Sequence, residues 1–89
     1  MRRTVHMVIK NYLRKRISIT RSNKKWSKRK MSEELAMDER SYSYIEKGES
    51  ACSAVTFILY LLFVLKEEER ADFLHDLREE IVKNWEDVA

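Results

Sequence analysis

The chain has 89 residues, of which 37% are charged and 44% hydrophobic, with one glycine, no proline and one cysteine. This length predicts one domain with a modest core, and the shortage of turn residues disfavours β-hairpins, whose tight turns favour glycine or asparagine. The lone cysteine excludes an intramolecular disulfide and favours a reducing, cytoplasmic location. Charges interrupt the apolar residues near the N-terminus, so no signal peptide is predicted. The expectation is an all-α protein of long helices.

Charge is strongly polarised along the chain. Residues 1–32 contain 12 basic and no acidic residues, a net charge of +12, and residues 33–89 contain 6 basic and 15 acidic residues, a net charge of 6 − 15 = −9. Such a chain attracts polyanions at one end and repels them at the other. Nucleic acid is the first candidate partner, and an anionic membrane surface is the second.

Two helical regions are predicted in the first half of the chain. Apolar residues recur at helical spacing over residues 5–22, opposite a basic face. After a join at residues 22–25, Ser27 is suited to cap a helix through Leu35, and Asp38 to cap another through Glu46. The pattern also permits one continuous helix. Gly48, the only glycine, predicts a left-handed helix end.

An apolar helix is predicted over residues 54–65, capped by Ser53. Its twelve residues rise only about 18 Å, too little for a membrane span of about 30 Å. Both sides of this helix need cover. The side expected to face the N-terminal helices contains Ala54, Phe57, Ile58 and Leu61, and the other side contains Val55, Leu59, Leu62 and Phe63.

The last helix is predicted to run from about residue 67 to about residue 86. It begins with three glutamates that suit a helix N-terminus, Glu67, Glu68 and Glu69. Its apolar stripe is expected to cover the helix at 54–65 and to supply part of a homodimer interface, and both tryptophans are expected in apolar cores. The stripe is Phe73, Leu74, Leu77, Ile81, Trp85 and Val88. The predicted dimer contacts are Leu59, Leu62, Phe73, Leu77, Ile81 and Trp85.

Residues 26–48, WSKRKMSEELAMDERSYSYIEKG, resemble the helix-turn-helix of the phage repressor and Cro family (Xre-type domains). Ser27 and Lys28 stand at the start of the family's second helix, and the run from Ile45 to Gly48 matches the end of its recognition helix. The resemblance extends over roughly residues 13–65. It implies a lambda-repressor-like helix-turn-helix domain at residues 1–66. The amphipathic C-terminal helix at 67–89, which lies outside the resemblance, is expected to pack on the domain or to dimerise and brings the expected number of helices to five.

Three positions depart from the family pattern. Ser32 stands where the family usually has alanine, and Tyr42 stands where it has a smaller inward residue, isoleucine or valine. Ala36 stands where the family has the turn glycine, which costs about 1 kcal/mol if the backbone there is left-handed. Tyr42 is expected to push the two helices slightly apart.

The resemblance implies that the helix beginning at Asp38 enters the major groove of DNA. The implied base contacts are Glu39, Arg40, Ser43 and Tyr44. The implied contacts with the DNA backbone are Lys24, Lys25, Ser27, Lys28, Arg29, Ser41 and Lys47. An ion pair between Arg21 and Glu46 is expected to hold the first helix against the third.

The sequence thus predicts a transcriptional regulator that binds double-stranded DNA sequence-specifically. We expect a small repressor that acts as a homodimer. The alternative is an antitoxin-like or inhibitory protein-interaction module on the same fold, and membrane attachment through the first helix is a third, weaker hypothesis. No enzymatic activity or cofactor is predicted. His6, His75 and Cys52 show no metal-ligand spacing, and Cys52 is expected to be half-buried.

Overall fold

Helices account for 80% of the chain in the computed structural model, which describes the backbone of residues 2–88 and the side chains of residues 5–85. No strand occurs in this part of the chain, so the predicted all-α, five-helix fold class is confirmed. The helices are α1 (Arg2–Asn23), α2 (Lys28–Glu34), α3 (Glu39–Lys47), α4 (Ala54–Leu59), which continues as a π-helical turn at Tyr60–Val64, and α5 (Glu67–Val88).

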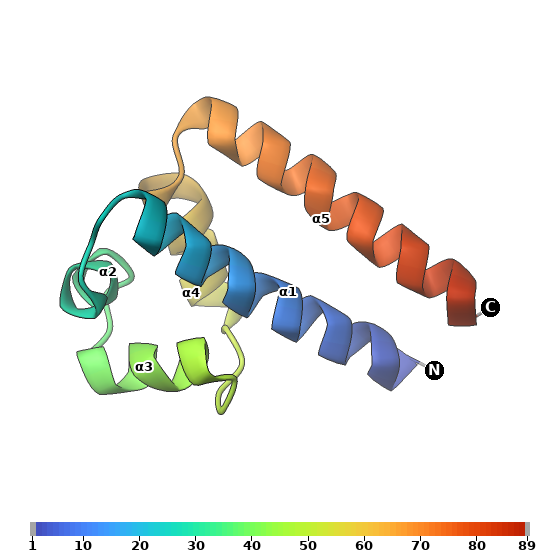
Figure 1. The fold of residues 1–89 in the computed structure, drawn as a ribbon, viewed down its shortest axis with the longest axis horizontal. Coiled ribbons are helices and arrows are strands. Elements are labelled where there is room, and N and C mark those ends of the chain that lie inside the picture. Colours follow the sequence, from blue (N-terminus) through green and yellow to red (C-terminus); the bar gives the residue numbers. More distant parts are fainter. Residues whose placement is uncertain (1, 89) are drawn as a thin grey trace.

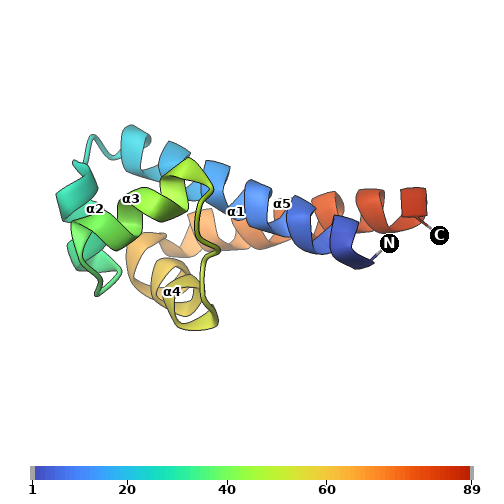
Figure 2. The same cartoon turned by 90° about the horizontal axis from the view of Figure 1, so that it is seen from below.

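The two long helices, α1 and α5, lie side by side and run in opposite directions (Figures 1 and 2). The three short helices gather around the C-terminal half of α1. The other halves of α1 and α5 extend past them, so both ends of the chain lie at the same end of the molecule. The last helix therefore packs mainly on α1. It reaches the helix at 54–65 through Phe73 and Arg70. The prediction that it covers the far side of that helix is wrong, because Val55, Leu62 and Phe63 are exposed.

Each short helix begins at the residue predicted to cap it. The Ser27 hydroxyl accepts a hydrogen bond from the Lys30 backbone N–H (3.0 Å), and the Asp38 carboxylate accepts one from the Ser41 N–H (2.7 Å). Ser53 accepts likewise from the Thr56 N–H (3.1 Å). These caps satisfy N–H groups that have no partner within the helix. They exclude one continuous helix through residues 26–47.

Left-handed backbone conformations end α2 and α3. Ala36 has φ = 55°, so an alanine adopts a conformation that favours glycine and bears the expected cost of about 1 kcal/mol. Gly48 has φ = 81°, and the Gly48 and Glu49 N–H groups donate to the carbonyls of Ile45 and Tyr44. A Cβ at position 48 would also lie 3.2 Å from Arg14 Nε. The left-handed conformation favours glycine there, and a larger residue would also make the Arg14 side chain shift slightly.

The core contains side chains from every helix. Phe73 of α5 is fully buried, and its ring lies 5.4 Å from the Tyr60 ring, edge to face, and 6.3 Å from the Tyr12 ring. The last helix is thus part of the same core as the rest of the chain. The remaining buried members of this cluster are Leu13, Ile17, Met31, Leu35, Tyr42, Val64 and Leu65.

The burial pattern corrects the predicted dimer surface. Phe73 is unavailable to a second copy, because it is buried within its own chain. Leu59 and Leu77 are partly buried against the core, and Ile81 lines a cleft between α1 and α5. Leu62 and Trp85 remain exposed, so the prediction that Trp85 lies in a core is wrong. Val88 lies outside the residues whose side chains are described.

The helix at 54–65 presents different faces from those predicted, and its last turn is π-helical. Thr56, Tyr60 and Val64 are buried, whereas Ala54 and Ile58, which were expected to face the N-terminal helices, are exposed. In the π turn the Leu65 N–H donates to the Tyr60 carbonyl five residues back (3.0 Å) rather than to Leu61. The Leu61 carbonyl, which loses its α-helical partner, accepts a hydrogen bond from Arg70 Nε at 2.7 Å.

Replacing Arg70 by methionine is expected to lower the free energy of unfolding by about 1.5–3 kcal/mol, because the Leu61 carbonyl loses a charged donor. Urea denaturation measures this effect. The matched control is Arg78→Met on the same helix, where the side chain is 75% exposed and the expected change is within about 0.5 kcal/mol. Equal effects of the two substitutions would show that Arg70 does not stabilise the π turn.

No helix within residues 2–88 combines the length and the apolar character that crossing a membrane requires.

Candidate nucleic-acid interface

The first turn of α3 is the most exposed part of the two-helix unit formed by α2 and α3. A four-residue turn, residues 35–38, separates these helices. Glu39, Arg40 and Ser41 are exposed, whereas Tyr42 and Ile45 point into the core. The inward residues hold α3 in place and leave its outer side free along the helix.

Arg40 is ordered by the side chain one turn later. Its Nε donates to the Tyr44 hydroxyl at 2.9 Å, and the guanidinium lies 5.7 Å from the centre of the Tyr44 ring. Among the described residues the two terminal nitrogens of Arg40 have no hydrogen-bond partner. A guanidinium held in this way loses less freedom on binding and retains a pair of donors for a bidentate contact.

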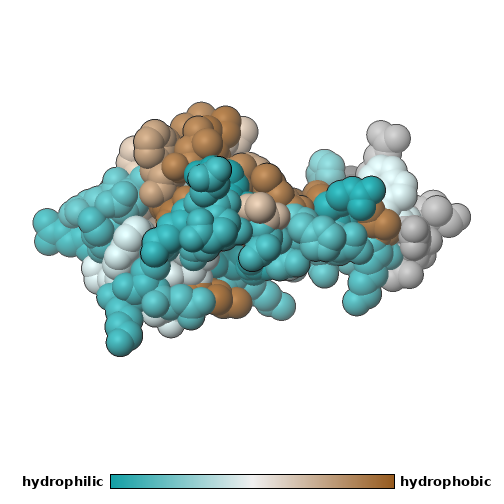
Figure 3. Space-filling model, turned by 90° about the horizontal axis from the view of Figure 1, so that it is seen from above, coloured by the Kyte–Doolittle hydropathy of each residue, from teal (hydrophilic) through white to brown (hydrophobic). Residues whose placement is uncertain are grey.

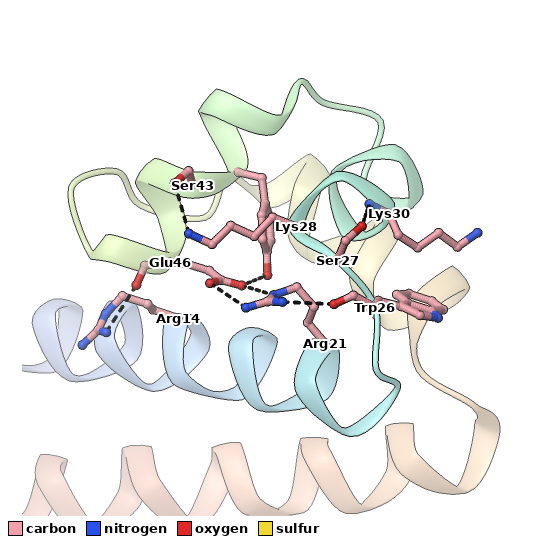
Figure 4. Close-up of polar contacts among 9 residues, drawn as sticks. Arg14, Arg21, Trp26, Ser27, Lys28, Lys30, Ser43 and Glu46 are labelled. Atoms are coloured by element: carbon pink, nitrogen blue, oxygen red, sulfur yellow. Dashed lines mark hydrogen bonds and ion pairs between the residues drawn. The ribbon is translucent and has the colours of Figure 1, made fainter.

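The start of α2 lies against the middle of α3. Lys28 Nζ is 3.5 Å from Ser43 Oγ, and Figure 4 shows the two side chains pointing toward each other. Arg29 is 79% exposed but lies 3.5 Å from Glu33. Lys25 is exposed in the preceding turn. Of these basic groups, Lys28 lies directly beside α3, and Arg29 and Lys25 are exposed on α2 and on the turn before it.

Three predicted backbone contacts have other roles. Lys24 Nζ lies 3.6 Å from Glu69 and 5.4 Å from the centre of the Trp26 ring, and its side chain is only 17% exposed. It therefore faces α5 and not α3. The hydroxyls of Ser27 and Ser41 serve helix caps, and that of Ser41 donates to Asp38 at 3.0 Å. Lys47 is exposed in the last turn of α3, far along the helix from Arg40.

Arg21 and Glu46 form the predicted ion pair between α1 and α3. Arg21 Nε and Nη2 donate to the two oxygens of the Glu46 carboxylate at 2.6 and 3.2 Å, and the Glu46 side chain is only 9% exposed (Figure 4). Arg21 Nη1 also donates to the Trp26 carbonyl at 3.0 Å. This bidentate pair fixes the direction of α3 relative to α1.

Tyr42 joins the pair through its hydroxyl, which donates to Glu46 one turn later on α3. Burial raises the pKa of Tyr42, and the neighbouring carboxylate raises it further. Burial alone would also raise the pKa of Glu46, but hydrogen bonds from Arg21 and Tyr42 outweigh it and hold that pKa below its usual value. The sequence pattern predicts for Tyr42 only a bulky, inward-pointing side chain. Its spacing of four residues from Glu46 is the signal for this contact.

Acidification is expected to remove the stabilisation that Glu46 provides. The pKa of Glu46 is lower in the folded chain than in the unfolded chain, where glutamate titrates at about 4.3. The contribution of Glu46 to the free energy of unfolding is therefore complete above that pH and is lost as the pH falls through the lowered pKa. Glu46→Gln should therefore destabilise the protein at about pH 7 but much less at about pH 3. Denaturant titrations at both pH values test this, and a difference that stays constant with pH would contradict it.

The one cysteine, Cys52, lies in the loop between α3 and α4. Cys52 is half-buried, as predicted, and burial raises the pKa of its thiol to about 11, so the nucleophilic thiolate is scarce near neutral pH. A cleft of about 370 Å³ beside it is lined mainly by apolar side chains of α1. Among the described residues, no three His, Cys, Asp or Glu side chains come together to hold a metal ion.

No family model, no curated protein and no solved structure matches this chain.

Proposed function

We propose that the protein is a cytoplasmic, sequence-specific DNA-binding regulator that inserts the N-terminal half of α3 into the major groove. The observation that supports this most strongly is the exposure of Arg40 at the start of a helix that the Ala36 turn separates from α2. The major groove is about 12 Å wide and admits one α-helix. A helix-turn-helix like that of repressors uses this part of its second helix to contact bases.

Each exposed side chain of α3 has a role in this proposal. Arg40 donates two hydrogen bonds to O6 and N7 of guanine, Glu39 accepts from N4 of cytosine, and Tyr44 both supports Arg40 and packs on a neighbouring thymine methyl. Ser43, beside Lys28, lies at the edge of the contact. The DNA phosphates are contacted by those predicted basic residues that have no other role in the fold, which are Lys25, Lys28, Arg29 and Lys47.

Replacing Arg40 by alanine is expected to weaken binding to a duplex selected from a random pool by roughly 5–150-fold, or about 1–3 kcal/mol, because a bidentate base contact is lost. Binding to an unrelated duplex should change far less. Fluorescence anisotropy titrations measure both, with Arg78→Ala on α5 as the control of equal charge.

A phosphate contact behaves differently. Lys28→Ala should weaken binding to all duplexes alike and reduce the salt slope by about 1. If Arg40→Ala instead lowers affinity for the selected and unrelated duplexes equally, Arg40 is a phosphate contact and the proposed base reading is wrong.

A protein-interaction module is the second candidate, favoured by the charge of the two-helix unit itself. Between residues 27 and 48 five basic side chains balance five acidic ones, and Glu39 at the tip of α3 repels phosphates. As an antitoxin-like or inhibitory module, the chain would bind its partner protein through this neutral surface. Failure of every duplex to bind at low salt, with a second protein co-purifying, would favour this candidate.

A further inference from the structure

A cleft lies where the first half of α1 passes the loop between α3 and α4 (Figure 1). Its volume is about 370 Å³, at the lower end of the range for small-molecule sites. Its lining is mainly apolar and includes Ile9, Leu13 and Cys52, and two polar side chains, His6 and Lys10, also line it. We propose that this cleft, the Lys10 cleft, binds a small amphipathic carboxylate whose charged group pairs with Lys10.

The charge around the Lys10 cleft favours an anionic ligand. No acidic side chain lines the cleft, and α1 contains no acidic residue from Arg2 to Asn23. Arg14, one turn after Lys10, is a like charge at the i+4 position, and such a pair on a helix is unfavourable. Arg14 Nη1 lies 3.5 Å from the Glu46 carbonyl, at the negative end of α3, whereas Lys10 forms no ion pair among the described residues. A ligand carboxylate would provide Lys10 with a counter-charge.

A single cationic side chain matches a ligand with one negative charge. Lys10 is the one lysine or arginine among the residues that line the described cleft. A phosphate monoester carries a charge of about −1.5 to −2 at neutral pH, and the bidentate contacts that hold it best come from arginine. A carboxylate carries a single charge, which one ammonium group neutralises. Since Lys10 is partly buried, salt screens this pair less than it screens an exposed pair.

The apolar part of the Lys10 cleft is held in place by the core. Leu13 is only 8% exposed and belongs to the buried cluster, and Ile9 and Cys52 pack against that cluster. A ligand therefore does not have to order these side chains when it binds, which lowers the cost of binding. Ligand sites combine such an apolar lining with a few polar groups that fix the orientation of the ligand. An alkyl chain on Ile9 and Leu13, with its carboxylate at Lys10, meets both conditions.

A second apolar surface is more exposed but has no charged group of its own. Val55, Leu62 and Phe63, on α4 and the π turn, are 68%, 55% and 68% exposed. Figure 3 shows hydrophobic side chains gathered along this edge of the molecule. Residues 50–65 contain no charged side chain, so this segment offers a carboxylate no counter-charge. An amphipathic carboxylate should therefore prefer the Lys10 cleft, and an uncharged ligand of the same length should lose that preference.

Amide chemical-shift titrations with three ligands of equal chain length test the selectivity for charge. The probes are octanoate, its neutral amide octanamide, and the cation octylamine. Octanoate should shift residues 6–13 and 51–53 in a saturable way, with a dissociation constant of about 1 mM because the ligand is small. Octanamide should bind in the cleft at least about fivefold more weakly, and octylamine should not bind there, because Lys10 repels it.

Substitutions of Lys10 separate the contribution of charge from that of packing. Lys10→Met keeps an unbranched side chain, so it should weaken octanoate binding at least about fivefold and leave octanamide binding unchanged. Lys10→Arg keeps the charge and should bind octanoate nearly as well as the wild type does. The matched control is Lys15→Met, which removes the same charge from an exposed position of α1 outside the cleft and should change neither affinity.

Two kinds of result would overturn the proposal. Equal binding of octanoate and octylamine in the cleft, or an unchanged affinity of Lys10→Met for octanoate, would show that the cleft does not select a carboxylate. Octanoate shifts centred on residues 55–63, or no saturable shift at all, would show that the Lys10 cleft is not the site. Because these titrations contain no DNA, their outcome does not depend on the proposed function.

Discussion

Replacing Arg21 by alanine is expected to lower the free energy of unfolding by about 3 kcal/mol and the melting temperature by at least about 12 °C. The substitution leaves the Glu46 carboxylate only 9% exposed and without its bidentate partner, and removing one member of a buried pair is far more costly than removing both. It also removes the donor to the Trp26 carbonyl at the start of the turn before α2. Thermal and urea denaturation measure the change.

Two further variants isolate the cause. In Arg21→Met combined with Glu46→Leu the unpaired charge is gone, so the double variant should be more stable than Arg21→Ala alone. The control is Arg29→Ala, which breaks the exposed pair with Glu33 and should change stability by no more than about 0.5 kcal/mol. A loss from Arg21→Ala no larger than that of the control would show that the network does not hold α3 on α1.

Replacing Phe73 by alanine is expected to cost about 3–5 kcal/mol, because the ring is fully buried among Tyr12, Phe57 and Tyr60 and its removal leaves a cavity. A domain of this length has a total stability of roughly 4–13 kcal/mol. The variant should therefore be largely unfolded at moderate urea concentrations. The guanidinium of Arg16, 5.2 Å from the ring centre, would also lose its aromatic partner.

The neighbouring residue on α5 provides the control for Phe73. Leu74 is 44% exposed, so Leu74→Ala should cost well under half as much. If α5 were only an appended helix, truncating Phe73 would release that helix but would not lower the stability of residues 5–65, which would still unfold cooperatively. A single unfolding transition that shifts as a whole, measured by both tryptophan fluorescence and far-ultraviolet circular dichroism, is the expected result.

Local features of the fold were predictable because the interactions behind them span only a few residues. Ser27, Asp38 and Ser53 cap helices through N–H groups three residues ahead, and Gly48 ends α3 because its φ is positive. The ion pair of Arg21 with Glu46 spans 25 residues and was predictable only through the family resemblance. Local chemistry alone does not specify which glutamate that arginine meets.

Features that depend on tertiary packing were not predictable in the same way. A regular helical period over residues 54–65 does not predict the π turn at Tyr60–Val64. Because this helix is apolar on nearly every side, its sequence also does not specify that Tyr60 is buried and Ile58 exposed. The apolar stripe of α5 indicates that the helix is buried on one side, but it does not identify the helix it packs on. Within the candidate site, no local pattern indicates that Lys24 pairs with Glu69 and so turns away from α3.

The most direct test of DNA reading by α3 is an amide chemical-shift map of the nitrogen-15-labelled protein titrated with a duplex selected from a random pool. The prediction is that the largest shifts fall on residues 38–44 and on residues 27–30 at the start of α2. Shifts confined to α5 or to the N-terminal half of α1, with residues 38–44 unchanged, would contradict it.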